Sequence, residues 1–144
     1  MDIDLTIGII SGVTAIISIL ISCFGIIHNR FLAVDKFLTK VEEDDFIKVK
    51  KYIYNHSGDF DVEDEQAAII VNFFHHWGML AKKHYLPLWV FDGATGYGLC
   101  RLYNKTKKYI IARREINSDS TYGEYFEWLS ETVERRLLKA HKNI

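Results

Sequence analysis

The chain has 144 residues, of which 49% are hydrophobic and 14% are aromatic, and its formal net charge is −1. These values exclude a globally disordered chain and argue against a strongly basic nucleic-acid-binding protein. Two cysteines cannot build a disulfide framework, and a single proline argues against a proline-rich linker or a turn-rich β-sandwich.

The first predicted element is a transmembrane helix over residues 5–27, preceded by a short tail of residues 1–4. This segment, LTIGIISGVTAIISILISCFGII, contains no charged side chain. As a helix it spans about 35 Å, which exceeds the hydrocarbon thickness of about 30 Å. The acidic start at Asp2 and Asp4 disfavours a secretory signal peptide. Lipoprotein processing at Cys23 is an alternative, because the preceding Leu-Ile-Ser fits that cleavage pattern.

The charges that flank this segment predict its orientation. Arg30, Lys36 and Lys40 follow the apolar run, whereas no Lys or Arg precedes it. Since cytoplasmic flanks of membrane helices are enriched in Lys and Arg, we expect a single-pass protein of the inner (plasma) membrane. Its N-terminus would lie outside and its C-terminal domain in the cytoplasm. Residues 28–40 keep apolar side chains at helical spacing and are expected to continue the helix as a juxtamembrane stalk.

Small residues recur every three or four positions along the predicted span. Such a stripe lets two helix backbones approach closely in lipid, so it favours association with a second copy or with another membrane protein. The alternative is a chance pattern, because small residues are common in membrane helices. The candidate helix-association face consists of Gly8, Ser11, Gly12, Ala15, Ser18, Ser22 and Gly25.

Residues 41–144 predict an all-α cytoplasmic domain, a bundle of about four helices. The first helix follows the acidic residues 42–45, which favour a helix N-terminus, and it ends at Ser57-Gly58. The second covers residues 62–83, the strongest helical pattern of the chain. For the short apolar segment at residues 86–91, a turn of helix packed into the core is expected, and a strand is the alternative.

Two further helices complete the predicted bundle. The third begins after Gly93 and extends to residue 115. The fourth begins with Ser120 or Thr121 as N-cap, where Glu124 three residues after Thr121 completes a capping box, and it runs to about residue 140. Apolar side chains at helical spacing on all four helices are expected to form the core. They are Phe46, Val49, Ile53, Ala67, Ile70, Phe74, Trp77, either Leu80 or Ala81, Leu99, Leu102, Tyr109, Ile110, Tyr122, Tyr125, Phe126, Leu129, Val133 and Leu137.

Motifs that could carry enzyme chemistry have simpler explanations. Residues 93–98 (GATGYG) lack the lysine of a phosphate-binding Walker loop, so we expect them to form a tight turn and a close helix contact. His75 and His76 point about 100° apart on a helix and are not expected to share a metal ion. No nucleophile has a catalytic neighbour in the sequence. We therefore expect no enzymatic activity, no metal and no cofactor, and the sequence identifies no small-molecule substrate.

Charge is divided unevenly between two segments. Residues 42–65 contain nine acidic side chains, whereas residues 101–114 contain six basic side chains and no acidic one. Arg101, Lys105 and Lys108 fall on one face of the predicted helix and are the candidate contact for an anionic surface. Ion pairing between the two segments, or a solvated face, is the first interpretation, and anionic lipid headgroups are the second. Nucleic acid is the least favoured, and none is expected as a partner.

Three patterns together carry a resemblance to a known family. They are N-F-F-x-x-x-G-x-L-x-K over residues 72–82, a basic helix with Arg113 and Arg114, and Y-F-x-x-L over residues 125–129. With these patterns the chain resembles a bacterial family of membrane-anchored helical proteins that is catalogued only as a domain of unknown function. The resemblance implies a membrane helix followed by a helical domain, and it supplies no catalytic residue. Similar anchored proteins occur among phage-exclusion genes, which makes defence a hypothesis by analogy.

Three hypotheses for the function follow. The leading one is a non-enzymatic, single-pass membrane protein whose helical domain binds copies of itself or another membrane protein. The first alternative is a membrane-perturbing effector in phage defence or a stress response. The second alternative is a domain that binds anionic lipid or a small ligand at the membrane surface.

Overall fold

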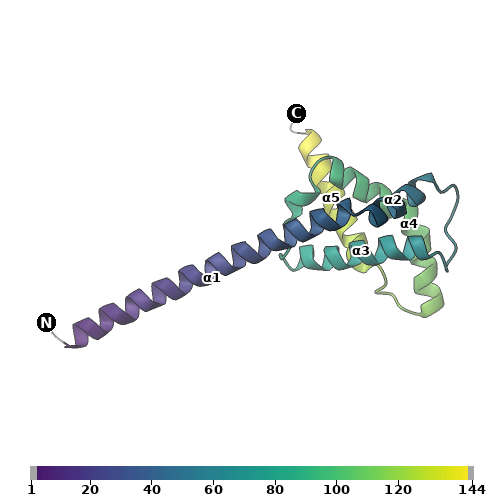
Figure 1. The fold of residues 1–144 in the computed structure, drawn as a ribbon. Helices are drawn as coiled ribbons and strands as arrows, with labels where there is room; N and C mark the ends of the chain where they lie inside the picture. The colour runs from purple at the N-terminus through teal and green to yellow at the C-terminus, as the bar shows by residue number, and fades with distance from the viewer. Residues whose placement is uncertain (1–2, 143–144) are drawn as a thin grey trace.

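The computed structural model describes the backbone of residues 3–142 and the side chains of residue 8 and residues 10–140. Within this part of the chain every regular element is a helix, and a long N-terminal helix projects from a bundle (Figure 1). The predicted all-α fold with four bundle helices is confirmed. The elements are α1 (Ile3–Glu42), α2 (Asp44–Asn55), α3 (Glu65–Lys82), the short 3-10 helix η1 (Leu88–Phe91), α4 (Ala94–Asn117) and α5 (Glu124–Lys142).

The helix α1 runs without a break through the predicted span and the predicted stalk. Its 40 residues correspond to a rod of about 60 Å. The predicted N-terminal tail is shorter than expected, because Ile3 and Asp4 already belong to α1, while residues 1–2 lie outside the described residues. An acidic residue in the first turn is favourable for a helix, so Asp4 does not delay its start.

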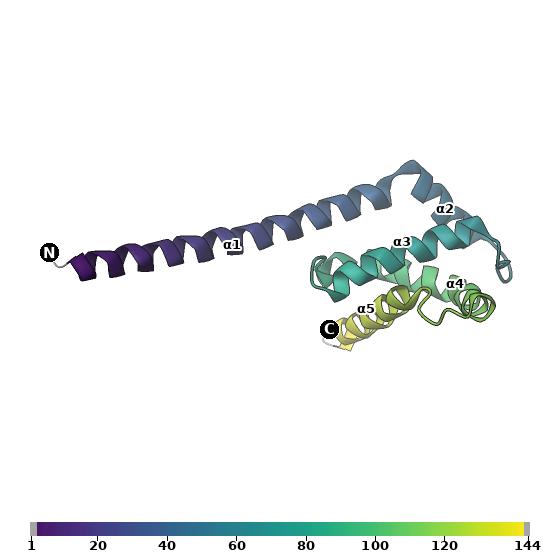
Figure 2. The same ribbon diagram turned by 90° about the horizontal axis from the view of Figure 1, so that it is seen from below.

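The bundle is built around α3, which packs along α5 and also contacts α2 and α4. Figure 2 shows α3 and α5 lying beneath the C-terminal half of α1. Most of the predicted core residues are buried, and of the pair Leu80 and Ala81 it is Ala81 that is buried. Tyr122 and Tyr125 are only half-buried. Because apolar burial is the main force that stabilises helical bundles, these contacts account for the arrangement.

The last turns of α1 belong to this core. Phe37 is fully buried, and its ring centroid lies 5.2 Å from that of Trp77 and 5.1 Å from that of Phe91, both in edge-on geometry. Val34, one turn earlier, is also buried. We call Val34 and Phe37, with the partly buried Ala33 and Val41, the docking face of α1.

Two local predictions were tested at the ends of helices. The predicted capping box at Thr121 is wrong, because the hydroxyl and the N–H of Thr121 donate to the Asp119 carboxylate at 2.7 and 2.9 Å. The N–H of Glu124 donates instead to the Thr121 carbonyl oxygen at 3.0 Å. The local turn to Asp119 forms in place of the capping box because a charged carboxylate oxygen is a strong hydrogen-bond acceptor. The alternative of a strand at residues 86–91 is also wrong, since η1 occupies the segment.

The glycine-rich residues 93–98 form a turn and a close contact, as predicted. Gly93 has a φ of 67°, a left-handed conformation that glycine adopts without strain, and it precedes α4. Gly96 lies against the Phe91 carbonyl oxygen, and a side chain there would come within 2.8 Å of the Val133 methyl group.

Candidate functional site

The segment of α1 before the docking face is the largest unpartnered surface of the described chain. Its apolar side chains are exposed, with Ile21 at 67% and Phe24 at 72% of their full accessibility. From Ile10 onward α1 is long and apolar enough to cross a membrane. Soluble proteins rarely expose a continuous apolar surface of this kind, which makes the segment a candidate membrane span by its length and composition.

The seven small residues of the candidate helix-association face all lie on this exposed part of α1. A Cβ atom added at Gly8, Gly12 or Gly25 would meet no other atom within 4 Å. The hydroxyl of Ser18 donates to the carbonyl oxygen of Thr14 at 2.9 Å, and that of Ser22 to the carbonyl oxygen of Ser18 at the same distance. These hydroxyls are therefore satisfied within the helix, and the stripe offers close backbone approach rather than polar contacts.

The three candidate contacts for an anionic surface have partners within the chain. Lys108 forms an ion pair with Asp59 at 2.9 Å, and Lys105 donates to the backbone carbonyl of His56 at 2.7 Å. The guanidinium of Arg101 lies 4.9 Å from the ring centroid of Tyr54. All three thus turn toward the end of α2 and the α2–α3 connection, which is the geometry expected for pairing between the basic and acidic segments. Lys108 and Asp59 are both well exposed, so their pair adds little to stability.

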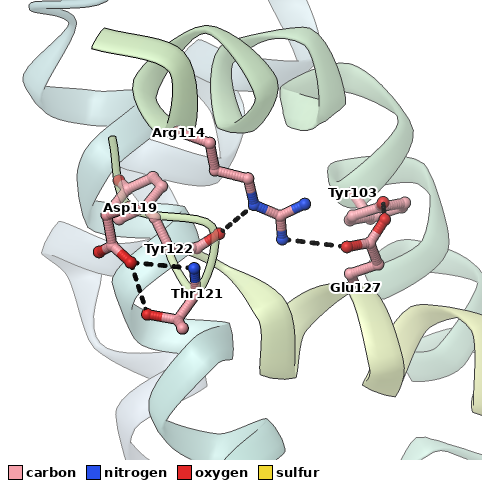
Figure 3. A network of polar contacts seen from close by, with 6 residues as sticks. All are labelled: Tyr103, Arg114, Asp119, Thr121, Tyr122 and Glu127. Atoms are coloured by element: carbon pink, nitrogen blue, oxygen red, sulfur yellow. Dashed lines mark hydrogen bonds and ion pairs between the residues drawn. The ribbon is translucent and has the colours of Figure 1, made fainter. Parts of the chain in front are cut away.

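A polar network joins α4 to α5, and Figure 3 shows its members. Arg114 donates through Nη2 to Oε2 of Glu127 at 3.0 Å and through Nε to the carbonyl oxygen of Tyr122 at 2.8 Å. The hydroxyl of Tyr103 donates to the other carboxylate oxygen of Glu127 at 2.9 Å. One carboxylate thus holds two side chains of α4, and the guanidinium also fixes the α4–α5 connection.

The network shifts the pKa values of its acidic members in opposite directions. Burial alone raises the pKa of Glu127, but the hydrogen bonds from Tyr103 and Arg114 outweigh it, and the pKa lies below its ordinary value. Burial, and then the bond to Glu127, raise the pKa of the Tyr103 hydroxyl. The bonds of this network tie α4 to α5 and to the connection between them.

We expect the Glu127→Gln substitution to lower the free energy of unfolding by about 1–2 kcal/mol at neutral pH, less than for a fully buried pair because both partners are partly exposed. A lowered folded-state pKa means that Glu127 stabilises the fold above its unfolded-state pKa, and that this stabilisation is lost as the pH falls through the folded-state pKa. Urea unfolding of the full chain in mild detergent from pH 7 to pH 3 measures how the free energy of unfolding depends on pH. The variant should show a shallower acid dependence, whereas Glu134→Gln, an exposed acid on the same helix, should match the wild type.

The adjacent histidines have separate environments. The ring centroid of His75 lies 5.0 Å from that of Tyr125, and its buried Nδ1 makes no hydrogen bond. Burial lowers the pKa of His75. His76 is exposed and faces the side of α1. Among the side chains that the structure describes, no group of three His, Cys, Asp or Glu residues is placed to hold a metal ion.

Comparison with protein-family models, with curated proteins and with solved structures finds no match to this chain. The fold and the exposed helix therefore define its class: an all-α protein whose N-terminal helix is long and apolar enough to span a membrane and ends in a helical bundle.

Proposed function

We propose that the chain is a single-pass inner-membrane protein that holds its bundle at the cytoplasmic face and assembles there with copies of itself or another membrane protein. One observation carries the proposal. The apolar segment of α1 packs against no other part of the described chain, whereas Phe37 on the same helix is fully buried in the bundle. The anchor and the domain are thus joined by continuous helix rather than by a flexible linker.

This continuity supports a role in assembly. Because Phe37 and Val34 fix α1 to the bundle, two α1 helices that associate in the membrane would bring their bundles together in a defined orientation. The exposed side of the same turns, with Phe31 at 70% and Leu38 at 44% accessibility, would then lie beside the partner. Arg30, Lys36 and Lys40, which follow the apolar run, support a cytoplasmic location for the domain.

Nothing in the described side chains supports a catalytic role. The carboxylate of Glu127 and the guanidinium of Arg114 are occupied with each other and with Tyr103 and the Tyr122 carbonyl oxygen. Membership of the bacterial family that the sequence resembles belongs to this proposal, and it adds no functional residue. The membrane location is tested first by alkaline extraction of membranes that contain the full chain. Retention in the pellet supports the anchor, and release into the supernatant contradicts it.

Assembly is tested by replacing Gly8 and Gly12 with leucine in the full chain. Leucine side chains would hold two helix backbones apart, so we expect the native mass in mild detergent to fall toward that of one chain. The matched control is Val13→Leu with Ile17→Leu, which has the same spacing on the opposite side of α1 and should leave the mass unchanged. An unchanged mass in the glycine variant would exclude this face, and a second protein in the complex would identify the partner.

A further inference from the structure

The end of the bundle that lies toward the N-terminal half of α1 is formed by the α3–α4 connection. The α3 helix runs antiparallel to α1 (Figure 2), and Phe37 packs against both Phe73 and Trp77. The step from Trp77 to Lys83 advances about 9 Å along α3. Because the two helices are antiparallel, the same distance along α1 leads from Phe37 back to Phe31. The connection at residues 83–93 therefore lies only about one helical turn beyond the end of the apolar run at Ile27.

The last turns of α5 lie at the same end. Figure 2 shows α5 running back in the direction of the N-terminal half of α1, whereas in Figure 1 α5 crosses the direction of α1 steeply. Arg136 on α5 forms an ion pair with Asp92 at 2.9 Å, which fixes the end of α5 to the α3–α4 connection. Exposed aromatic, aliphatic and basic side chains gather on these two segments. We call this set the proximal face: Lys83, Tyr85, Trp89, Arg135, Leu138 and Lys139.

The two ends of the bundle differ in charge. Residues 83–93 and 135–142 contain five Lys or Arg residues and one acid, Asp92, which is paired with Arg136. At the opposite end, the connections at residues 56–64 and 118–123 contain five acids and no Lys or Arg, and Lys105, Lys108, Arg113 and Arg114 of α4 reach into these connections. The end nearer the apolar run therefore has an excess of basic side chains, whereas the acids of the opposite end lie beside basic side chains of α4.

We propose that the proximal face rests on the anionic headgroups of the same bilayer that α1 crosses; this rests on the proposed membrane anchor. Trp89 is 60% exposed and Tyr85 57% exposed, and both residue types favour the membrane–water interface. Lys83 and Lys139 supply positive charge for lipid phosphate groups. The lipid contact thus lies on the proximal face and not on Arg101, Lys105 and Lys108, which turn toward the α2–α3 connection.

The test uses the full chain in lipid nanodiscs that contain phosphatidylglycerol with bromine near the headgroup end of its acyl chains. Bromine quenches the fluorescence of a tryptophan only when the two lie close together. The chain contains three tryptophans, and one of them, Trp77, is buried. We expect clear quenching in the wild type and loss of at least half of it in Trp89→Phe. Equal quenching in the two proteins while both remain in the discs would overturn this contact alone. A chain that does not stay in the discs would overturn the membrane anchor and, with it, this inference.

A second set of variants, which reverse charges, tests whether the contact depends on anionic headgroups. Lys83→Glu with Lys139→Glu should reduce the quenching of Trp89 at least twofold. The control is Lys51→Glu with Lys107→Glu. These two lysines are exposed and lie outside the proximal face, so the control carries the same change in charge and should retain the quenching of Trp89. High salt should weaken the wild-type signal because the contact is electrostatic. Equal quenching in discs made of phosphatidylcholine alone, with bromine at the same position, would overturn the requirement for anionic lipid.

Discussion

The Gly78→Ala substitution is expected to lower the free energy of unfolding of the bundle by about 3 kcal/mol. Gly78 lies in the middle of α3, where the helix crosses α5 backbone to backbone. A Cβ atom at this position would meet the carbonyl oxygen of Tyr125 and would lie 2.8 Å from its carbonyl carbon. Because these are backbone atoms, no side chain can rotate away, and the two helices must separate. Urea unfolding of the full chain in mild detergent, followed by circular dichroism, measures the loss.

Gly98→Ala is the matched control for this prediction. Gly98 also lies within a helix, but an added Cβ atom would meet only the Tyr54 hydroxyl, at an ordinary distance of 3.4 Å. Alanine favours a helix over glycine by about 1 kcal/mol, so this variant should be as stable as the wild type or slightly more stable. Equal stability of the Gly78 and Gly98 variants would show that the α3–α5 crossing is looser than described.

The Phe37→Ala substitution is expected to release α1 from the bundle at a cost of about 3–5 kcal/mol. Phe37 is fully buried and packs against Phe73, Trp77 and Phe91. Its loss removes the largest side chain of the docking face while leaving the α3–α5 contact in place. We therefore expect the fluorescence of Trp77 to shift to longer wavelength with little change in helix content.

Leu38→Ala is the control, because Leu38 is the next residue and is 44% exposed. This substitution should leave both the tryptophan emission and the stability close to the wild-type values. If Phe37→Ala also left the emission unchanged, the docking of α1 on the bundle through Phe37 would be refuted. A loss of helix content in Phe37→Ala would show that docking and bundle folding are one cooperative unit.

The helices of the bundle were predictable because their apolar periodicity and their boundaries agree. In α4 the pattern from Leu99 to Ile110 places one face in the core, and Gly93 marks the start. In α3 the first helical residue follows Asp64, whose side chain accepts a hydrogen bond from the N–H of Ala67 at 2.8 Å. Such local signals need no knowledge of the tertiary fold.

Other features depend on residues that only the tertiary structure brings together. The predicted stalk is divided in the structure: Phe37 packs into the bundle while Phe31 is exposed. Glu127 lies in the first turn of α5, and its bonds to Tyr103 and Arg114 cross between helices. The proximal face joins Trp89 to Lys139 across 50 positions of the sequence, so no local pattern could reveal it.

The uninterrupted course of α1 also has a mechanical consequence. Membrane helices tilt by about 20° on average, and the tilt changes with the thickness of the bilayer. Phe37 lies about 32 Å along the helix from the middle of the apolar run, so a change in tilt of about 20° moves it sideways by about 11 Å. If α1 crosses a bilayer as proposed, its docking face makes it a lever arm, and a thinner or thicker membrane would displace the whole bundle.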